Sequence, residues 1–124
     1  MFRSFLMVGI GGAIGSMARY GVTYITTRIT PHTTFPLGTL AVNLSGCLLI
    51  GILFGISMRN LWLEDAGWLL LATGFCGGFT TFSTFALENI QMSGRQENIS
   101  ALLYTALSLV LGLLLCRVGV WMAK

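Results

Sequence analysis

Charged residues are scarce in this sequence of 124 residues, of which Asp, Glu, Lys and Arg together make up 9%. A soluble domain needs about a quarter of its residues charged to keep its surface hydrated, so an ordinary soluble fold is excluded. Disorder is excluded too, because 55% of the residues are hydrophobic and disordered chains have low hydrophobicity. The composition therefore predicts an integral membrane protein.

The residue sets of catalysis and metal binding are also lacking. His32 is the single histidine, and no Ser/His/Asp, Cys/His or paired-carboxylate set occurs. The three cysteines, Cys47, Cys76 and Cys116, lack paired metal-ligand spacing and lie in apolar segments, which favours packing roles. The net charge of +3 comes from scattered single bases, which suits anionic lipid headgroups better than nucleic acid. We expect neither an enzyme nor a nucleic-acid-binding protein, and nothing implies a soluble protein partner.

Four apolar segments follow one another along the chain. A membrane-crossing helix needs about 20 apolar residues, so four crossings use about 80. We expect spanning helices near residues 4–27, 38–58, 67–91 and 99–121, joined by short loops into a single transmembrane domain over residues 1–124. Because no small-residue cleavage site precedes a polar mature domain, the first segment is interpreted as a retained helix rather than a signal peptide.

Glycine and tryptophan positions add detail to these segments. The run from Gly9 to Gly15 suggests a nucleotide-binding loop, but its spacing is wrong and no strand precedes it. The pairs Gly11/Gly15 and Gly51/Gly55 instead fit the small-xxx-small pattern of close helix packing. Indole rings favour membrane interfaces, and the three tryptophans lie near the expected helix ends: Trp62, Trp68 and Trp121.

The positive charges give almost no orientation signal. Four crossings place both termini on one side, so Arg3, Arg59 and Lys124 share that side while Arg28 and Arg95 share the other. Orientation normally follows an excess of Lys and Arg on the cytoplasmic side. The near balance favours insertion in both directions and an antiparallel pair of chains. The alternative is that a one-charge difference still orients the chain.

Polar residues inside the apolar segments are costly and mark places to look for function. Thr39 and Asn43 are four residues apart on one helix face, as are Tyr104 and Ser108, and Gly112 follows one turn later. All four side chains are neutral hydrogen-bond donors. They form either a polar pathway or hydrogen bonds that hold helices together, and the sequence leaves both interpretations open.

The third segment contains adjacent glycines followed by two threonines, a poor helix interior. A break near residues 76–80 is expected. Non-helical backbone at membrane depth is tolerated only where it is buried in protein or lines a cavity, and freed carbonyls suit a hard cation such as Na⁺. The alternative is a kinked helix whose hydroxyls bond back to their own backbone.

Two aromatic residues and two charged residues in the apolar segments are further candidates for function. Phe82 and Phe85 lie on one helical face, and the edges of their rings carry a partial positive charge that an anion can contact. The alternative is that the two rings pack in the core, which is the more common role of aromatic residues on one helix face. Arg19 either makes a vestibule positive or extends to the interface. Glu88 either joins a pathway or lies at headgroup depth.

Three stretches resemble the CrcB/Fluc family of bacterial fluoride channels: residues 12–20 (GAIGSMARY), 38–46 (GTLAVNLSG) and 74–85 (GFCGGFTTFSTF). The similarity runs over essentially the whole chain, and the third stretch is highly specific. The resemblance implies an all-α integral membrane protein with four transmembrane helices and a third helix broken mid-membrane, assembled as an antiparallel, dual-topology homodimer in the bacterial cytoplasmic (inner) membrane. It also implies two pores for passive fluoride efflux, which would reduce fluoride toxicity.

The resemblance assigns roles residue by residue. Asn43 matches the family's pore asparagine, and the edges of Phe82 and Phe85 face fluoride. Arg19 matches a vestibule arginine. Gly112 stands where some relatives have serine, at the far end of the polar positions. The other pore-lining positions are Thr39, Ser83, Thr84, Tyr104 and Ser108. The backbone carbonyls assigned to a structural Na⁺ at the dimer interface are those of Gly77 and Thr80.

Two other function classes are weighed against a fluoride channel. A small four-helix, proton-coupled cation or drug antiporter needs a membrane-embedded carboxylate, but the first segment has no acid and Glu88 lies toward the end of the third. In a non-transporting membrane assembly protein, every polar row would only hold helices together. Fluoride is a small, strongly hydrated hydrogen-bond acceptor, and neutral donors can replace its water without trapping it, which favours the channel.

Overall fold

The computed structural model describes residues 1–60, 63 and 65–124. The expectation that Trp62 lies at a membrane interface therefore falls outside the described residues. The first two helices are α1 (Phe2–Ile29) and α2 (Leu37–Ser57), and the last is α7 (Asn98–Ala123). Between them the chain forms one interrupted helical span, made of α4 (Ala66–Trp68), η1 (Leu69–Cys76), α5 (Gly77–Phe79) and α6 (Phe82–Gly94).

Four stretches of the described chain are helical, long and apolar enough to cross a membrane: Phe2–Ile29, Leu37–Ser57, Ala66–Gly94 and Asn98–Ala123. The prediction of an all-α chain with four such helices is confirmed. The first, third and fourth continue slightly past the expected ranges 4–27, 67–91 and 99–121, since a helix need not end where its apolar run ends. Pro31 and Pro36 lie in the loop between α1 and α2, where proline stops a helix.

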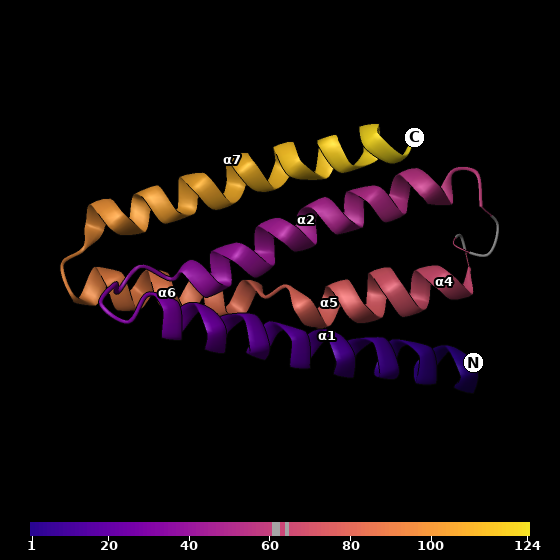
Figure 1. Ribbon diagram of the computed structural model, residues 1–124, viewed down its shortest axis with the longest axis horizontal. Helices are drawn as coiled ribbons and strands as arrows, with labels where there is room; N and C mark the ends of the chain where they lie inside the picture. The colour runs from indigo at the N-terminus through magenta and orange to yellow at the C-terminus, as the bar shows by residue number, and fades with distance from the viewer. Residues whose placement is uncertain (61–62, 64) are drawn as a thin grey trace.

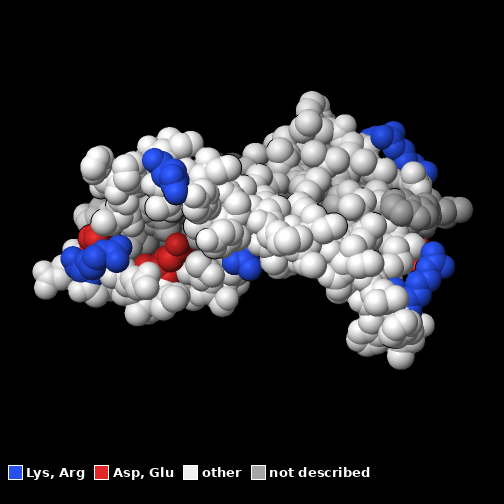
Figure 2. Space-filling model, turned by 60° about the horizontal axis from the view of Figure 1, so that its bottom comes forward, with Lys and Arg blue, Asp and Glu red and all other residues white. Residues whose placement is uncertain are grey.

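The four spans form an elongated bundle with both chain termini at the same end (Figure 1). The α1–α2 loop and the α6–α7 turn lie together at the opposite end. Helix α2 packs mainly against α7, and α1 packs along η1 and α5. On the face drawn in Figure 2, most charged side chains lie toward the two ends and one basic side chain lies near the middle.

Glycines allow the close approach of these helices. A Cβ on Gly11 would lie 2.9 Å from the Phe75 nitrogen, and a Cβ on Gly15 would lie 2.9 Å from the Phe79 nitrogen. On the other side of the bundle, Gly51 and Gly55 face the backbone of α7, and Gly119 of α7 faces the backbone of α2. The packing role predicted for the glycine pairs is therefore confirmed.

The third span is the irregular one. Its first part, Leu69–Cys76, is a π-helix, whose turn is wider than that of an α-helix and was not expected from the sequence. The helix then continues through Gly77 to Phe79 and gives way to extended residues at Thr80 (φ −89°, ψ 158°) and Thr81 (φ −151°, ψ 119°). The non-helical pair thus follows the glycines rather than including them.

Thr81 begins the next helix as its N-cap. Its side-chain oxygen accepts a hydrogen bond from the Thr84 amide at 3.2 Å, the usual contact by which threonine satisfies a free N–H at a helix start. β-Branched residues also favour extended backbone. Two adjacent threonines, the second acting as a cap, therefore explain why the helix stops after Phe79 and restarts at Phe82.

Candidate functional site

Asn43 of α2 holds the non-helical residue Thr81 through two hydrogen bonds. Its side-chain Nδ2 donates to the Thr81 carbonyl at 3.1 Å, and its Oδ1 accepts from the Thr81 amide at 2.8 Å. The side-chain amide nitrogen of asparagine carries two hydrogens, so Asn43 keeps a second N–H donor beyond these two hydrogen bonds. The asparagine thus braces the interruption and still offers an N–H group.

This brace releases backbone carbonyls of the third span. A backbone amide has one hydrogen. The Thr81 amide donates its hydrogen to Asn43 rather than to the carbonyl of Gly77, one turn earlier. In the same way the Thr84 amide donates to the Thr81 side chain rather than to the Thr80 carbonyl. The carbonyls of Gly77 and Thr80 therefore lose their ordinary helical donors.

Arg19 of α1 contacts a third carbonyl near the same place. Its Nε donates to the Gly78 carbonyl at 3.0 Å, in a partly buried position. The guanidinium thus satisfies part of the helix end at α5, a contact that neither of the two sequence-based interpretations anticipated. A charged group bonded to a backbone carbonyl inside a membrane segment is a common way of lowering its cost.

A cavity of about 210 Å³ lies beside Asn43 and brings together residues from α2, α6 and α7. Its lining consists of Asn43, Cys47, Thr81, Phe82, Phe85, Ser108 and Leu109. The Ser108 hydroxyl is buried and has no hydrogen-bond partner in the described part of the chain. Because an unpaired buried hydroxyl is costly, this one is suited to donating to something that enters the cavity.

A second cluster centres on Glu88 of α6. Oε2 of Glu88 accepts from the Thr39 hydroxyl and Oε1 accepts from the Tyr104 hydroxyl, both at 3.0 Å. Tyr104 is fully buried. The sequence left the role of Glu88 open; the structure makes it the partner of two predicted pathway residues. Its position one turn after Thr84 was the available signal.

Phe85 joins the two clusters. Its ring centroid lies 5.7 Å from that of Phe82 and 5.0 Å from that of Tyr104, and it also lines the cavity beside Asn43. We call the connected set the polar row. Its members, from one cluster to the other, are Asn43, Ser108, Phe82, Phe85, Tyr104, Glu88 and Thr39.

Ser83 and Thr84 lie outside this row. Ser83 is exposed, and its hydroxyl oxygen is 3.5 Å from that of Thr81. Thr84 contributes its backbone amide to the cap of α6, and neither residue lines the cavity beside Asn43. A Cβ on Gly112 of α7 would lie 3.4 Å from the Cys47 sulfur.

Gly77 and Thr80 line a separate hollow of about 220 Å³ between α2 and the third span. A Cβ on Gly77 would meet no atom of the described residues within 4 Å, so this glycine faces the open side of the hollow. The released carbonyls fit the oxygen ligands that a hard cation such as Na⁺ prefers. Two carbonyls alone are too few to complete the coordination of such an ion.

One ion pair lies outside the membrane segments, at the end of the bundle near Glu88. Glu97 bonds to Arg95 and to Thr34 of the α1–α2 loop. The hydrogen bonds from Arg95 and Thr34 hold the pKa of the Glu97 carboxyl below its ordinary value. The contact ties the two loops of this end together.

Comparison with known proteins gives a consistent result. Residues 6–120 match the family model described as CrcB-like protein, Camphor Resistance (CrcB). The chain is 44% identical over 112 residues to a protein of Azobacteroides pseudotrichonymphae named fluoride-specific ion channel FluC, covering 90% of this chain and 89% of the relative. Proteins of the same name from Leptospira interrogans (46% over 122 residues, 98% and 95% covered) and Paracoccus denitrificans (48% over 113 residues, 91% and 88% covered) are similar as well.

Proposed function

This chain belongs to the CrcB family, which confirms the predicted resemblance, and we propose that it is a fluoride-specific ion channel. It would let fluoride leave a bacterial cell passively across the cytoplasmic membrane and so reduce fluoride toxicity. Its named relatives are ion channels rather than enzymes. The observation that carries the proposal is the buried Ser108 hydroxyl, which has no hydrogen-bond partner among the described residues and lines one cavity with the Asn43 amide.

The cavity supplies what a fluoride pore needs. A dehydrating fluoride ion must find replacement donors, yet it must be held weakly enough to leave. The second N–H of Asn43 and the hydroxyl of Ser108 are neutral donors, and the rings of Phe82 and Phe85 have partially positive edges. None of these four groups carries a full positive charge, so the site favours a small anion without trapping it.

Beyond the cavity, Glu88 holds the next donors in place. The hydroxyls of Tyr104 and Thr39 both point to its carboxylate. A fluoride ion arriving past Phe85 competes with that carboxylate for the same two hydrogens. Glu88 thus keeps the donors oriented when no ion is present. When an ion moves through, each hydroxyl donates its hydrogen bond to fluoride instead of to the carboxylate.

The working unit would be an antiparallel, dual-topology homodimer with two pores. The near balance of Lys and Arg between the two ends supports it, as does the open hollow beside Gly77 and Thr80. A structural Na⁺ bound at this interface by carbonyls of both copies would supply positive charge at the centre. The interruption at Thr80 and Thr81 would then lie mid-membrane, with its released carbonyls directed to that ion.

Reconstitution into liposomes tests the proposal. The channel predicts fluoride efflux without proton exchange and with negligible chloride flux. Phe82→Ile and Asn43→Ala should each lower the efflux strongly, whereas Phe5→Ile, a matched change at an exposed position of α1, should leave it unchanged. Proton-coupled exchange would support an antiporter, and no flux at all would support an assembly protein. Efflux that is lost in Glu88→Gln but survives in Asn43→Ala and Phe82→Ile would contradict the site assignment.

A further inference from the structure

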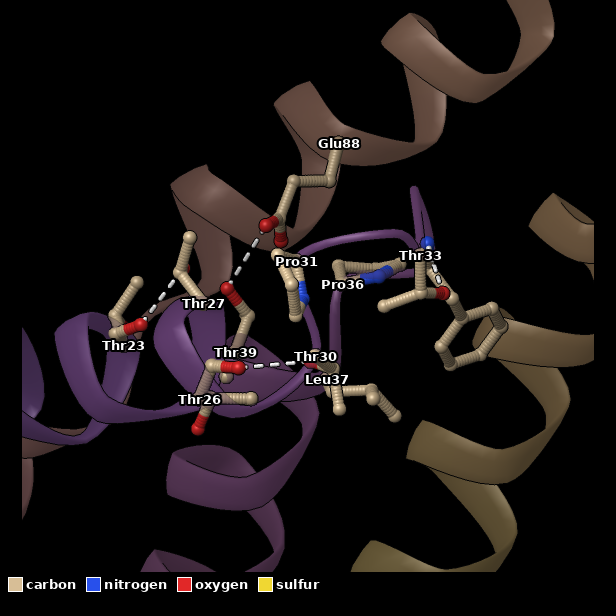
Figure 3. Close-up of a pocket in the computed structure, with 12 residues that line it drawn as sticks. Thr23, Thr26, Thr27, Thr30, Pro31, Thr33, Pro36, Leu37, Thr39 and Glu88 are labelled. Carbon is tan, nitrogen blue, oxygen red and sulfur yellow. Dashed lines mark hydrogen bonds between the residues drawn. The ribbon is translucent and has the colours of Figure 1, made fainter.

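A third hollow lies where α1 ends and α2 begins, and Glu88 of α6 is part of its lining. It has a volume of about 130 Å³, and its lining includes six threonines and one acid. The close-up in Figure 3 shows these side chains around the α1–α2 loop. We call it the threonine pocket, and its polar members are Thr23, Thr26, Thr27, Thr30, Thr33, Thr39 and Glu88.

Four of the six threonine hydroxyls in this pocket already donate their hydrogens. Thr26, Thr27 and Thr30 each donate to the carbonyl four residues earlier, at 2.7, 2.8 and 2.7 Å. Thr39 donates to Glu88. A hydroxyl has one hydrogen but two lone pairs, so these oxygens offer the pocket only acceptor positions. The threonine pocket is thus richer in acceptors than the donor-lined cavity beside Asn43, which favours a cation over an anion.

Glu88 adds a full charge to this acceptor-rich wall. Each of its oxygens accepts one hydroxyl, an arrangement that suits an ionised carboxylate because both of its oxygens are acceptors. In the described part of the chain the one ion pair is Arg95–Glu97, so Glu88 has no basic partner there. A partly buried carboxylate in a membrane segment is costly when its charge is not balanced.

We propose that the threonine pocket binds a monovalent cation against the Glu88 carboxylate and the threonine oxygens. A volume of 130 Å³ equals about four water molecules at about 30 Å³ each, which suits a partly hydrated alkali metal ion or an ammonium group. A divalent ion normally takes several carboxylates, and this pocket has one. This role rests on the proposed function: the cation balances the negative charge of Glu88 beside the polar row, which conducts an anion.

Crystals grown in Rb⁺ instead of Na⁺ test the site by anomalous scattering. The wild-type protein should show a peak in the threonine pocket. Glu88→Gln should abolish it and Thr27→Val, which replaces one pocket oxygen by a methyl group, should reduce its occupancy severalfold. Thr34→Val is the matched control, because Thr34 lies in the loop that follows α1 but bonds to Glu97 outside the pocket. Absence of the wild-type peak at saturating Rb⁺, or its persistence in Glu88→Gln, would overturn the proposal.

The cation has two natural sources, a free alkali metal ion or the ammonium of an ethanolamine lipid headgroup. Short-chain phosphatidylethanolamine and phosphatidylglycerol, added separately to the Rb⁺-loaded protein, distinguish them. Loss of the Rb⁺ peak with the ethanolamine lipid alone identifies the headgroup as an occupant. Retention of the peak with both lipids identifies the free ion.

Transport tests the balancing role separately. With N-methyl-D-glucamine as the only cation, which is too large for the pocket, fluoride efflux should fall severalfold and Rb⁺ should restore it. Thr27→Val should need a severalfold higher Rb⁺ concentration, although it leaves the residues of the Gly77 hollow unchanged. Rb⁺ bound in the pocket without any effect on efflux would refute the role. A Rb⁺ peak in a protein with no efflux in any cation would refute the proposed channel but not the cation site.

Discussion

Removing the Asn43 side chain should damage both folding and conduction, because this side chain does two things. In Asn43→Ala the amide and carbonyl of Thr81 lose their partners. An ordinary hydrogen bond contributes about 0.5–1.5 kcal/mol and an unsatisfied buried group costs about 1–3 kcal/mol. We therefore expect a loss of about 2–4 kcal/mol in stability, with the lower value applying if water from the cavity replaces the lost bonds.

Conduction should fall through a separate loss. A hydrogen bond to a charged group contributes about 1.5–3 kcal/mol, and the second N–H of Asn43 is such a donor for fluoride. Since 1.4 kcal/mol is a factor of ten, efflux should fall by about 10- to 100-fold. Asn43→Asp tests the donor role, because an aspartate keeps the acceptor for the Thr81 amide but loses the donors and adds a negative charge. It should conduct no better than Asn43→Ala.

A fluoride electrode reports efflux from liposomes, and thermal unfolding in detergent reports stability. The control is Ser45→Ala on the same helix, since the Ser45 hydroxyl bonds to the Ala41 and Val42 carbonyls of that helix. That change should leave both measurements nearly unaltered. Asn43→Ala with wild-type stability would refute the bracing role, and Asn43→Asp with wild-type efflux would refute the donor role.

Three further predictions follow from other contacts. Tyr104→Phe removes a hydroxyl from Glu88 and should lower fluoride efflux severalfold with a stability loss of about 1 kcal/mol, whereas unchanged efflux would exclude Tyr104 from the pathway. Gly119→Val places a side chain where the Ile52 nitrogen lies 2.8 Å from a Cβ, so a drop of about 1–3 kcal/mol in unfolding free energy is expected; an unchanged melting temperature would contradict the tight packing. The lowered pKa of Glu97 means that its stabilisation is present above the unfolded pKa of about 4.3 and disappears as pH falls through the folded value, so wild type and Glu97→Gln should converge in thermal stability only in acid.

The sequence was sufficient for the spans and for many members of the site, since apolar run length and polar exceptions are local features. Asn43, Phe82, Phe85 and Ser108 were all expected in the pathway, and they line one cavity. The bracing of Thr81 by Asn43 was not foreseeable, because it depends on how two residues 38 positions apart in the chain come together.

Glu88 and Arg19 show the same limit for charged residues. Each was recognised as unusual, but its partner could not be named. Arg19 meets a carbonyl 59 residues away, and Glu88 meets Thr39 49 residues away. Which group neutralises or orients a charge is decided by packing, for which the spacing of residues along one helix contains no information.

The π-helical stretch Leu69–Cys76 lets the third span hold residues that an α-helix of the same rise would not contain. In an α-helix, one residue corresponds to about 100° of rotation about the axis. Because a π-turn absorbs an extra residue, a single deletion there would let the stretch relax toward α-helix with Thr81 still directed to Asn43. A further insertion would turn Thr81 away, so a single deletion in Leu69–Cys76 should be tolerated better than a single insertion.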